Sequence, residues 1–220
     1  LPLVFGPVAL AYNIDGVDDL VLDAETTAKI FNGSITKWND PAIAALNEGI
    51  ELPDAGITPI VRSDSSGTTD NFQQYLETAS NGAWTSGAGS DFTGGVGEGA
   101  KGSAGVAQAV AGSPNSITYV EKSFADQNGL SVARIDNGSG PVELTEETAG
   151  KAIEGAEFVP ASEGDLTLDL SSIFGSSEEG AYPLVLATYE IVCSAGYDAD
   201  TAAAVKSFLI SAATEGQDGL

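Results

Sequence analysis

Apolar positions recur along the chain with two periods, one that helices favour and one that strands favour. Residues 69–79 predict an amphipathic helix, because their apolar side chains fall at the i, i+3, i+4 and i+7 spacing of one helix face. These side chains are Phe72, Tyr75, Leu76 and Ala79. Runs rich in Val, Ile, Thr and Tyr predict strands over residues 57–62 and 182–193. Strands that alternate with helices indicate an α/β sheet fold.

Start and stop signals bound two more helices. Asp23 is a good N-cap for a helix over residues 24–32, and Asn39-Asp40-Pro41 supplies a cap and a first-turn proline for a helix over residues 41–47. Pro7 interrupts the first predicted strand and indicates an edge strand or a bend. The other predicted elements are strands over 1–13, 116–120 and 130–135, helices over 105–111, 121–128, 145–157 and 199–214, and loop-rich stretches over 81–105 and 160–181.

Composition and charge narrow the class of protein. Apolar residues make up 42% of the 220, which is enough for a packed core. No stretch approaches the roughly 18 consecutive apolar residues of a membrane span, so we expect a soluble chain. Asp and Glu outnumber Lys and Arg by 32 to 8, for a formal net charge of −24. This balance argues against a nucleic-acid partner, which requires a basic footprint, and predicts a well-solvated acidic surface.

Histidine, cysteine and methionine are absent or nearly absent, and this limits the possible chemistry of the chain. The absence of histidine removes catalytic schemes that use imidazole and most transition-metal sites. The single cysteine, Cys193, excludes an internal disulfide and lies in an apolar run that predicts a buried thiol. The chain has no methionine and begins within a predicted strand, so we expect a fragment or a processed form that lost an upstream piece.

The segment from Arg62 to Thr69 combines the features of an anion site. A predicted strand ends at Arg62 and a predicted helix begins near Thr69. A helix N-terminus offers unpaired N–H groups and a partial positive charge, which together hold small anions. Gly67 lets the backbone approach closely, while Ser66 and Thr68 add hydroxyl donors.

Arg62 is a further candidate ligand for an anion at this segment. Arg62 is one of two arginines in the chain, and its planar guanidinium fits an oxyanion. Asp64, two residues further on, is placed to pair with Arg62 and to fix its orientation. The same residues could instead serve structure alone, with Ser66 and Thr68 capping a helix and Arg62 making a surface ion pair. Taken by themselves, the residues leave both interpretations open.

Other motifs favour structural roles. Residues 94–103 are rich in glycine, but they contain Lys-Gly-Ser rather than the Gly-Lys-Ser/Thr order of a nucleotide-binding P-loop, and no clear strand precedes them. Ser65 and Ser66 lack a neighbouring base for nucleophilic catalysis. Acidic clusters at residues 15–19 and 146–147 lack the spacing of a calcium loop. Trp38 and Trp84 are predicted as partly buried aromatics.

Five segments together resemble one family. Val61-Arg62-Ser63-Asp64-Ser65-Ser66-Gly67-Thr68-Thr69 resembles the phosphate loop of the phosphate-binding proteins that serve the high-affinity phosphate ABC importers of bacteria. The resemblance runs from residue 1 to about residue 215. The other matching segments are Gly6-Pro7-Val8-Ala9-Leu10-Ala11-Tyr12-Asn13, the signature from Ile30 to Pro41 with its continuation to Asn47, Ile117-Thr118-Tyr119-Val120-Glu121, and Tyr182-Pro183.

The resemblance implies a fold and a site. The fold would be the two-lobe α/β fold of type II periplasmic binding proteins, with the anion between the lobes and the first lobe incomplete. Residues 1–6 would be a crossover strand from the first lobe, residues 7–183 the second lobe, and residues 184–220 the return strand and helix of the first lobe. The implied phosphate ligands are Arg62, Ser66, Gly67 and Thr68, with Asp64 orienting the arginine.

The resemblance also implies what lies outside these residues. The family's N-terminal part carries further donors and an aspartate that accepts a hydrogen bond from protonated phosphate. That aspartate discriminates against sulfate, which has no proton to offer. No position of this chain corresponds to that part, so the chain carries about half of the expected site.

The leading hypothesis is therefore a receptor that captures inorganic phosphate and delivers it to an ABC permease. It implies no catalytic residue, cofactor or metal. We expect it outside the cytoplasm, in the periplasm or at the cell surface, with membrane association only through an upstream anchor. The alternatives are a receptor for another oxyanion such as sulfate, a phosphate-ester hydrolase using the same loop, and an interaction protein that kept the fold and lost transport.

Overall fold

The computed structural model describes residues 2–159 and 166–217. These residues belong to two compact units. The larger unit comprises Gly6–Glu157 and Asp169–Leu186, and the smaller comprises the described residues of Leu1–Phe5, Phe158–Leu168 and Ala187–Leu220. The boundaries predicted after residues 6 and 183 assign lobes rather than compact units, and they stay a prediction.

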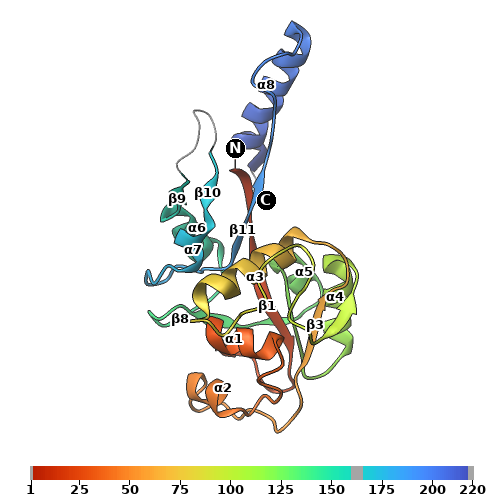
Figure 1. The fold of residues 1–220 in the computed structure, drawn as a ribbon, viewed down its shortest axis with the longest axis vertical. Coiled ribbons are helices and arrows are strands. Elements are labelled where there is room, and N and C mark those ends of the chain that lie inside the picture. The colour runs from red at the N-terminus through yellow and green to blue at the C-terminus, as the bar shows by residue number, and fades with distance from the viewer. Residues whose placement is uncertain (1, 160–165, 218–220) are drawn as a thin grey trace. The chain divides into compact units, whose positions relative to one another are not determined.

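A mixed six-stranded sheet organises the larger unit (Figure 1). Its order is β11-β1-β5-β3-β4, and β6 pairs with β1 beside this path. β1 is antiparallel to β5, whereas β3 is parallel to both β5 and β4. The carboxyl ends of β3, β4 and β5 therefore meet at one edge of the sheet. The strands are β1 (Pro2–Asn13), β3 (Thr58–Arg62), β4 (Glu98–Ala100), β5 (Ser116–Glu121), β6 (Ser131–Val132) and β11 (Val185–Tyr189).

Helices α3 (Gly67–Ala79) and α4 (Gly102–Gly112) pack against this sheet, and each follows one of its parallel strands. The predicted helix over residues 69–79 is confirmed. It begins two residues earlier because the side chain of Ser66 accepts the N–H groups of Thr68 and Thr69. The predicted cap at Asp23 is confirmed too, since Asp23 and Thr26 form a capping box at the start of α1 (Ala24–Phe31).

The remaining elements are two smaller sheets and several helices. A three-stranded sheet has the order β2-β7-β8, and β9 pairs with β10. Their bounds are β2 (Val21–Asp23), β7 (Arg134–Asp136), β8 (Pro141–Val142), β9 (Glu157–Phe158) and β10 (Leu168–Asp169). The other helices are α2 (Pro41–Leu46), α5 (Lys122–Gln127), α6 (Glu146–Glu154), α7 (Leu170–Phe174), α8 (Ala199–Ala213) and the 3-10 helix η1 (Glu215–Gln217).

An aromatic cluster forms the core between α1, α3 and β5. The ring of Phe72 stacks on Tyr119 at 4.3 Å and meets Phe31 edge-on at 4.9 Å between ring centroids. Such pairs add specific geometry to the burial of large apolar surfaces. Trp38 and Trp84 are 0% and 3% exposed, so the prediction that they are only partly buried is wrong.

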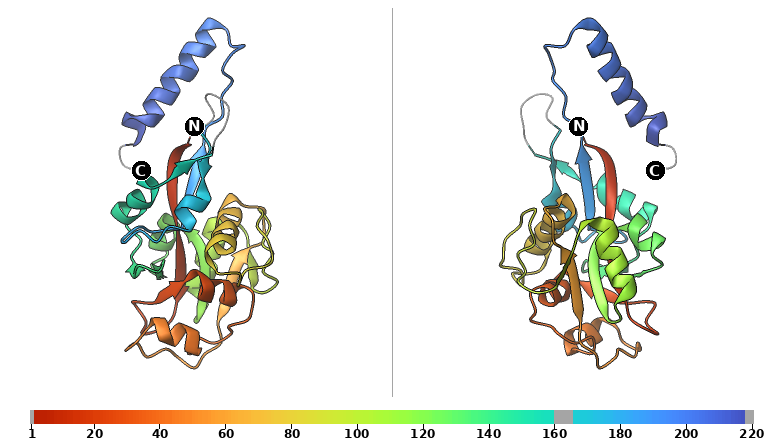
Figure 2. Two further views of the ribbon diagram at one scale, coloured as in Figure 1. Left: turned by 60° about the vertical axis from the view of Figure 1, so that its left-hand side comes forward. Right: turned by 90° about the vertical axis from the view of Figure 1, so that its right-hand side faces the viewer.

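Two predictions about β1 and its neighbours need correction. β1 is an interior strand that runs along the middle of the sheet, so Pro7 does not mark an edge (Figure 2). The register of β1 with β5 starts at Val8, one residue after Pro7, so the missing proline N–H costs no hydrogen bond in that ladder. The strand predicted over residues 130–135 is divided into β6 and β7 at Ala133.

The C-terminal predictions hold in part. The strand predicted over residues 182–193 is shorter, because the residues after Tyr189 leave the sheet. Cys193 is exposed, so the prediction of a buried thiol is wrong. The helix predicted over residues 199–214 is confirmed as α8, although none of its residues is buried. Within the acidic section predicted as loop, residues 160–165 lie outside the described residues, and residues 168–174 form β10 and α7.

Candidate functional site

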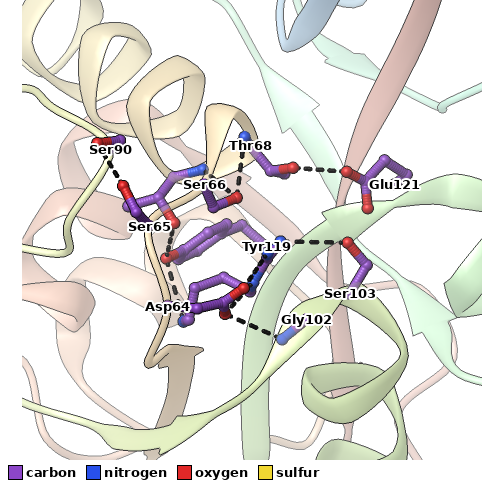
Figure 3. Close-up of polar contacts among 11 residues, drawn as sticks. Asp64, Ser65, Ser66, Thr68, Ser90, Gly102, Ser103, Tyr119 and Glu121 are labelled. Atoms are coloured by element: carbon purple, nitrogen blue, oxygen red, sulfur yellow. Dashed lines mark hydrogen bonds and ion pairs between the residues drawn. The ribbon is translucent and has the colours of Figure 1, made fainter.

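The predicted anion loop lies at the edge of the sheet where β3 ends and α3 begins (Figure 3). Ser66 has extended backbone geometry, and its hydroxyl accepts from the N–H of Thr68 at 3.1 Å and of Thr69 at 3.4 Å. The N–H of Ser66 donates to the carbonyl of Ser90 at 2.8 Å. These bonds fix the first turn of a thirteen-residue helix, whose macrodipole favours an anion at this end.

Arg62 and Asp64 form a two-bond fork. Nε of Arg62 donates to Oδ1 of Asp64 and one terminal nitrogen donates to Oδ2, each at 2.8 Å. The other terminal nitrogen donates to Oγ of Ser103 at 3.2 Å. A guanidinium has five N–H donors, so two of them have no partner among the described residues. The side chain of Arg62 is only 11% exposed, which makes unpaired donors on it costly unless something accepts them.

The electrostatics of the fork keep both groups charged. The hydrogen bonds from Arg62 hold the pKa of Asp64 well below its usual range, and the N–H of Gly102, 2.9 Å from Oδ1, adds to this. The pKa of Arg62 is raised, first by its hydrogen bonds to Asp64 and then by the nearby charges, although burial opposes this. The fork fixes the orientation of the guanidinium, and the role of Asp64 in orienting Arg62 for a ligand stays a prediction.

The hydroxyl of Tyr119 contacts both ends of the loop. Its hydroxyl accepts the backbone N–H of Arg62 at 3.3 Å and lies 2.8 Å from Oγ1 of Thr69. Tyr119 is 1% exposed and stacks on Phe72, so this hydroxyl is held by the packed core. Burial raises the pKa of the Tyr119 phenol, which keeps it a neutral hydrogen-bonding group. One side chain thus joins the end of β3 to the start of α3.

The other predicted ligands lie together in the same turn. The N–H of Gly67 has no partner among the described residues, and the hydroxyl of Ser66 accepts two hydrogen bonds and retains its own hydrogen to donate. Thr68 differs, because its hydroxyl donates to Oε1 of Glu121 at 2.5 Å. The structure therefore brings Arg62, Asp64 and the three loop residues together at one edge. Their contact with an anion stays a prediction.

Sequence reasoning missed three residues at this edge. Gly102 and Ser103 support the fork, and they come from the glycine-rich stretch of residues 94–103 that was predicted to be a loop opening a helix. The stretch itself contains a short strand that was not predicted, because β4 (Glu98–Ala100) pairs with β3 and leads into α4. Glu121, at the end of β5, is the third. The available signal was the repeated change from strand to glycine to helix, although the pairing of these strands is not local in sequence.

Other candidate sites for this anion have little support. Among the described residues, no group of three or more His, Cys, Asp or Glu is placed to hold a metal ion. A cavity of about 420 Å³ lies in the larger unit and is lined by side chains that include Asp23, Tyr75 and Phe174, but by none of the predicted ligands. None of the helices in the described part of the chain combines the length and apolarity that a bilayer crossing requires.

Comparisons with known proteins identify the family of the chain. Phosphate-binding protein PstS 3 of Mycobacterium leprae is 52% identical over 223 residues, and PstS 2 of Mycobacterium tuberculosis is 53% identical over 222 residues. Each match covers 100% of this chain and 60% of the relative, so the chain spans less than two thirds of the length of these proteins. The resemblance predicted from the sequence is confirmed.

Solved structures show the same fold. A high-affinity periplasmic phosphate-binding protein, PfluDING, solved with bound phosphate, has a TM-score of 0.66 at 24% identity and covers 94% of this chain and 61% of its own. PstS from Borrelia burgdorferi has a TM-score of 0.51 at 22% identity and covers 70% and 55%. The predicted α/β fold of the periplasmic binding proteins is confirmed. A family model described as the PBP superfamily domain matches residues 1–213, and the chain therefore belongs to the PBP superfamily.

Proposed function

We propose that the loop of residues 61–69 binds inorganic phosphate, and that the protein containing this chain is a receptor that delivers phosphate to an ABC importer. The observation that carries the proposal is the guanidinium of Arg62. It is nearly buried, oriented by Asp64, and has two N–H donors without a partner among the described residues. The same loop carries Ser66 and Gly67 at the start of α3, and the N–H of Gly67 has no partner among the described residues.

The names of the relatives support phosphate as the anion. PstS 3 of Mycobacterium leprae and PstS 2 of Mycobacterium tuberculosis are both phosphate-binding proteins by name. The proposed receptor has no catalytic step, since it would capture and release its ligand unchanged. It would act outside the cytoplasmic membrane, where an importer collects its substrate, and the permease of that importer would be its partner.

The strong negative charge of the chain is compatible with this role. Its formal value of −24 is spread over the sequence, and salt screens such a field over about 8–10 Å at physiological ionic strength. The donors of the loop act at hydrogen-bond distance, where screening is weak. Local donors therefore decide whether the anion binds, and the diffuse field mainly affects how fast it arrives.

Titration calorimetry of the full-length protein with phosphate and with sulfate tests the proposal. Arg62→Gln removes the guanidinium and should weaken phosphate binding by at least about 100-fold, because charged donors to an anion are among the strongest hydrogen bonds. Arg134→Gln is the matched control, since Arg134 is the other arginine and pairs with Asp19 at 2.6 Å instead. It should bind phosphate like the wild type. Equal phosphate affinities for Arg62→Gln and the wild type would reject the site.

A further inference from the structure

The cavity of about 420 Å³ in the larger unit lies at the carboxyl end of α3, whereas the anion loop lies at the start of that helix. Its volume falls in the range of small-molecule sites, roughly 300–1,000 Å³. The walls come from the start of α1, the last residues of α2, α3 and α7, the turn between β7 and β8, and Pro183. The proposed phosphate receptor makes no use of this cavity.

The helix ends around the cavity give it a negative polarity. Leu46, Ala79 and Phe174 are the last residues of α2, α3 and α7, and all three line the cavity. The last carbonyl groups of a helix lack partners within the helix and carry a partial negative charge. Only α1 contributes its opposite end, and there Asp23 and Glu25 add two carboxylates. The walls therefore present mainly hydrogen-bond acceptors.

Two of the carboxylates that line the cavity keep an oxygen available. Oδ1 of Asp23 accepts the N–H and the hydroxyl of Thr26, each at 2.7 Å. Oδ1 of Asp136 accepts the N–H groups of Gly138 at 2.8 Å and Gly140 at 3.2 Å. The Oδ2 atoms of both aspartates have no hydrogen-bond partner among the described residues. No lysine or arginine is among the described residues that line the cavity, so its own lining does not neutralise these charges.

The hydroxyl of Tyr75 is a buried polar group that lacks a partner. Tyr75 is 1% exposed and lines the cavity, and its hydroxyl has no hydrogen-bond partner among the described residues. Burial raises the pKa of this phenol, and the charge of Asp23, on the same cavity, raises it further. The hydroxyl therefore stays neutral and lies within reach of a negative field. A buried hydroxyl without a partner is costly, and a ligand in the cavity would remove that cost.

We propose that this cavity binds a small organic cation that carries ammonium groups. An ammonium group has only N–H donors, which match carboxylate oxygens, helix carbonyls and the hydroxyl of Tyr75. The rings of Tyr75 and Phe174 meet edge-on with their centroids 6.1 Å apart, and aromatic rings attract cations. A metal ion fits less well, because no three His, Cys, Asp or Glu of the described residues are placed to hold one. Separate carboxylates suit the ends of an extended cation.

Titration calorimetry of the full-length protein with 1,5-diaminopentane tests this site. We expect one diamine per chain and no binding of 1,5-pentanediol, which has the same length and no charge. Tyr75→Phe should weaken the diamine by about tenfold, the order of one hydrogen bond to a charged group. Asp136→Asn should have a similar effect, because the amide oxygen can still accept from Gly138 and Gly140 while the charge is lost.

Asp54→Asn is the matched control. It removes the same charge from an exposed residue that pairs with Lys37 and does not line the cavity, so the diamine should bind as it does to the wild type. An equal loss of affinity in this control would overturn the proposal, since a general attraction of cations to a chain of formal charge −24 would then explain the binding. Absence of diamine binding, equal binding of the diol, or unchanged affinity in Tyr75→Phe and Asp136→Asn would also overturn it.

Two further measurements keep these outcomes distinct from misfolding and from the proposed function. Tyr75→Phe breaks no hydrogen bond among the described residues, so its urea midpoint should not fall below that of the wild type. None of the residues that line the cavity belongs to the loop of residues 61–69, so phosphate affinity should be the same in both cavity variants. A failure of the diamine test would therefore leave the phosphate receptor intact.

Discussion

Replacement of Tyr119 by phenylalanine tests whether the core holds the anion loop. Tyr119→Phe keeps the ring that stacks on Phe72 and removes only the hydroxyl. That hydroxyl accepts the N–H of Arg62 at 3.3 Å and pairs with Oγ1 of Thr69 at 2.8 Å. Thr69 is 0% exposed, so its hydroxyl would remain buried without this partner. We expect a loss of unfolding free energy together with weaker phosphate binding, because the end of β3 is no longer tied to α3.

The magnitude follows from the groups left unpaired. One buried polar group without a partner costs about 1–3 kcal/mol, and the longer bond from Arg62 contributes less. We therefore expect Tyr119→Phe to cost about 2 kcal/mol of unfolding free energy. With an m-value of about 2 kcal/mol per molar urea, the midpoint should fall by about 1 M.

Urea unfolding followed by tryptophan fluorescence is the appropriate assay, since Trp38 and Trp84 are both buried in the larger unit. Thr69→Val supplies the second arm of a double-mutant cycle. Removing both hydroxyls should cost clearly less than the sum of the single changes, because neither partner is then left unpaired. Additive costs would refute the argument that the bond between Tyr119 and Thr69 matters.

Three further predictions concern charge, pH and packing. The rate of phosphate association should rise with ionic strength, because the formal charge of −24 repels an anion until salt screens it; a stopped-flow rate indifferent to salt would contradict this. The pKa of Asp64 is lower in the folded protein than its unfolded value of about 3.9. The contribution of Asp64 to the free energy of unfolding is therefore complete above the unfolded pKa and is lost as the pH falls through the lower folded pKa. The urea midpoints of wild type and Asp64→Asn should therefore differ by a constant amount from about pH 5 to 8 and converge only in stronger acid, and convergence near pH 6 would show the reasoning to be wrong. Gly94→Ala should lower the thermal midpoint markedly, since a Cβ there would overlap the carbonyl of Phe31 and the ring of Phe92. Gly150→Ala is the control: it lies in the middle of α6, its added Cβ would meet no atom within 4 Å, and it should stabilise the protein by about 0.5–1 kcal/mol.

Local patterns predicted the elements around the site because their determinants are local. The apolar spacing of residues 69–79 is a property of one helix face, and Asp23 caps the helix that follows it directly. The fork between Arg62 and Asp64 was also predictable, since the two residues are only two positions apart. In each case the partners lie within one turn or one short loop.

The residues that contact the loop from other strands could not be predicted from local patterns. Gly102 and Ser103 reach Asp64 and Arg62 only because β4 pairs with β3, a pairing that depends on the whole sheet. Glu121 lies 53 positions from Thr68 and meets it because β5 ends at the same edge. A local pattern can also mislead. The apolar run that ends at Cys193 has the composition of a strand, but the chain leaves the sheet after Tyr189 and Cys193 is exposed.

A crystal structure of the full-length protein with phosphate is the most direct test of the central claim. The account predicts one tetrahedral anion at the start of α3. It should be bonded to the two N–H donors of Arg62 that have no partner among the described residues, to the N–H of Gly67 and to the hydroxyl of Ser66. Phosphate bound at another place, with the guanidinium of Arg62 still paired only to Asp64 and Ser103, would contradict it.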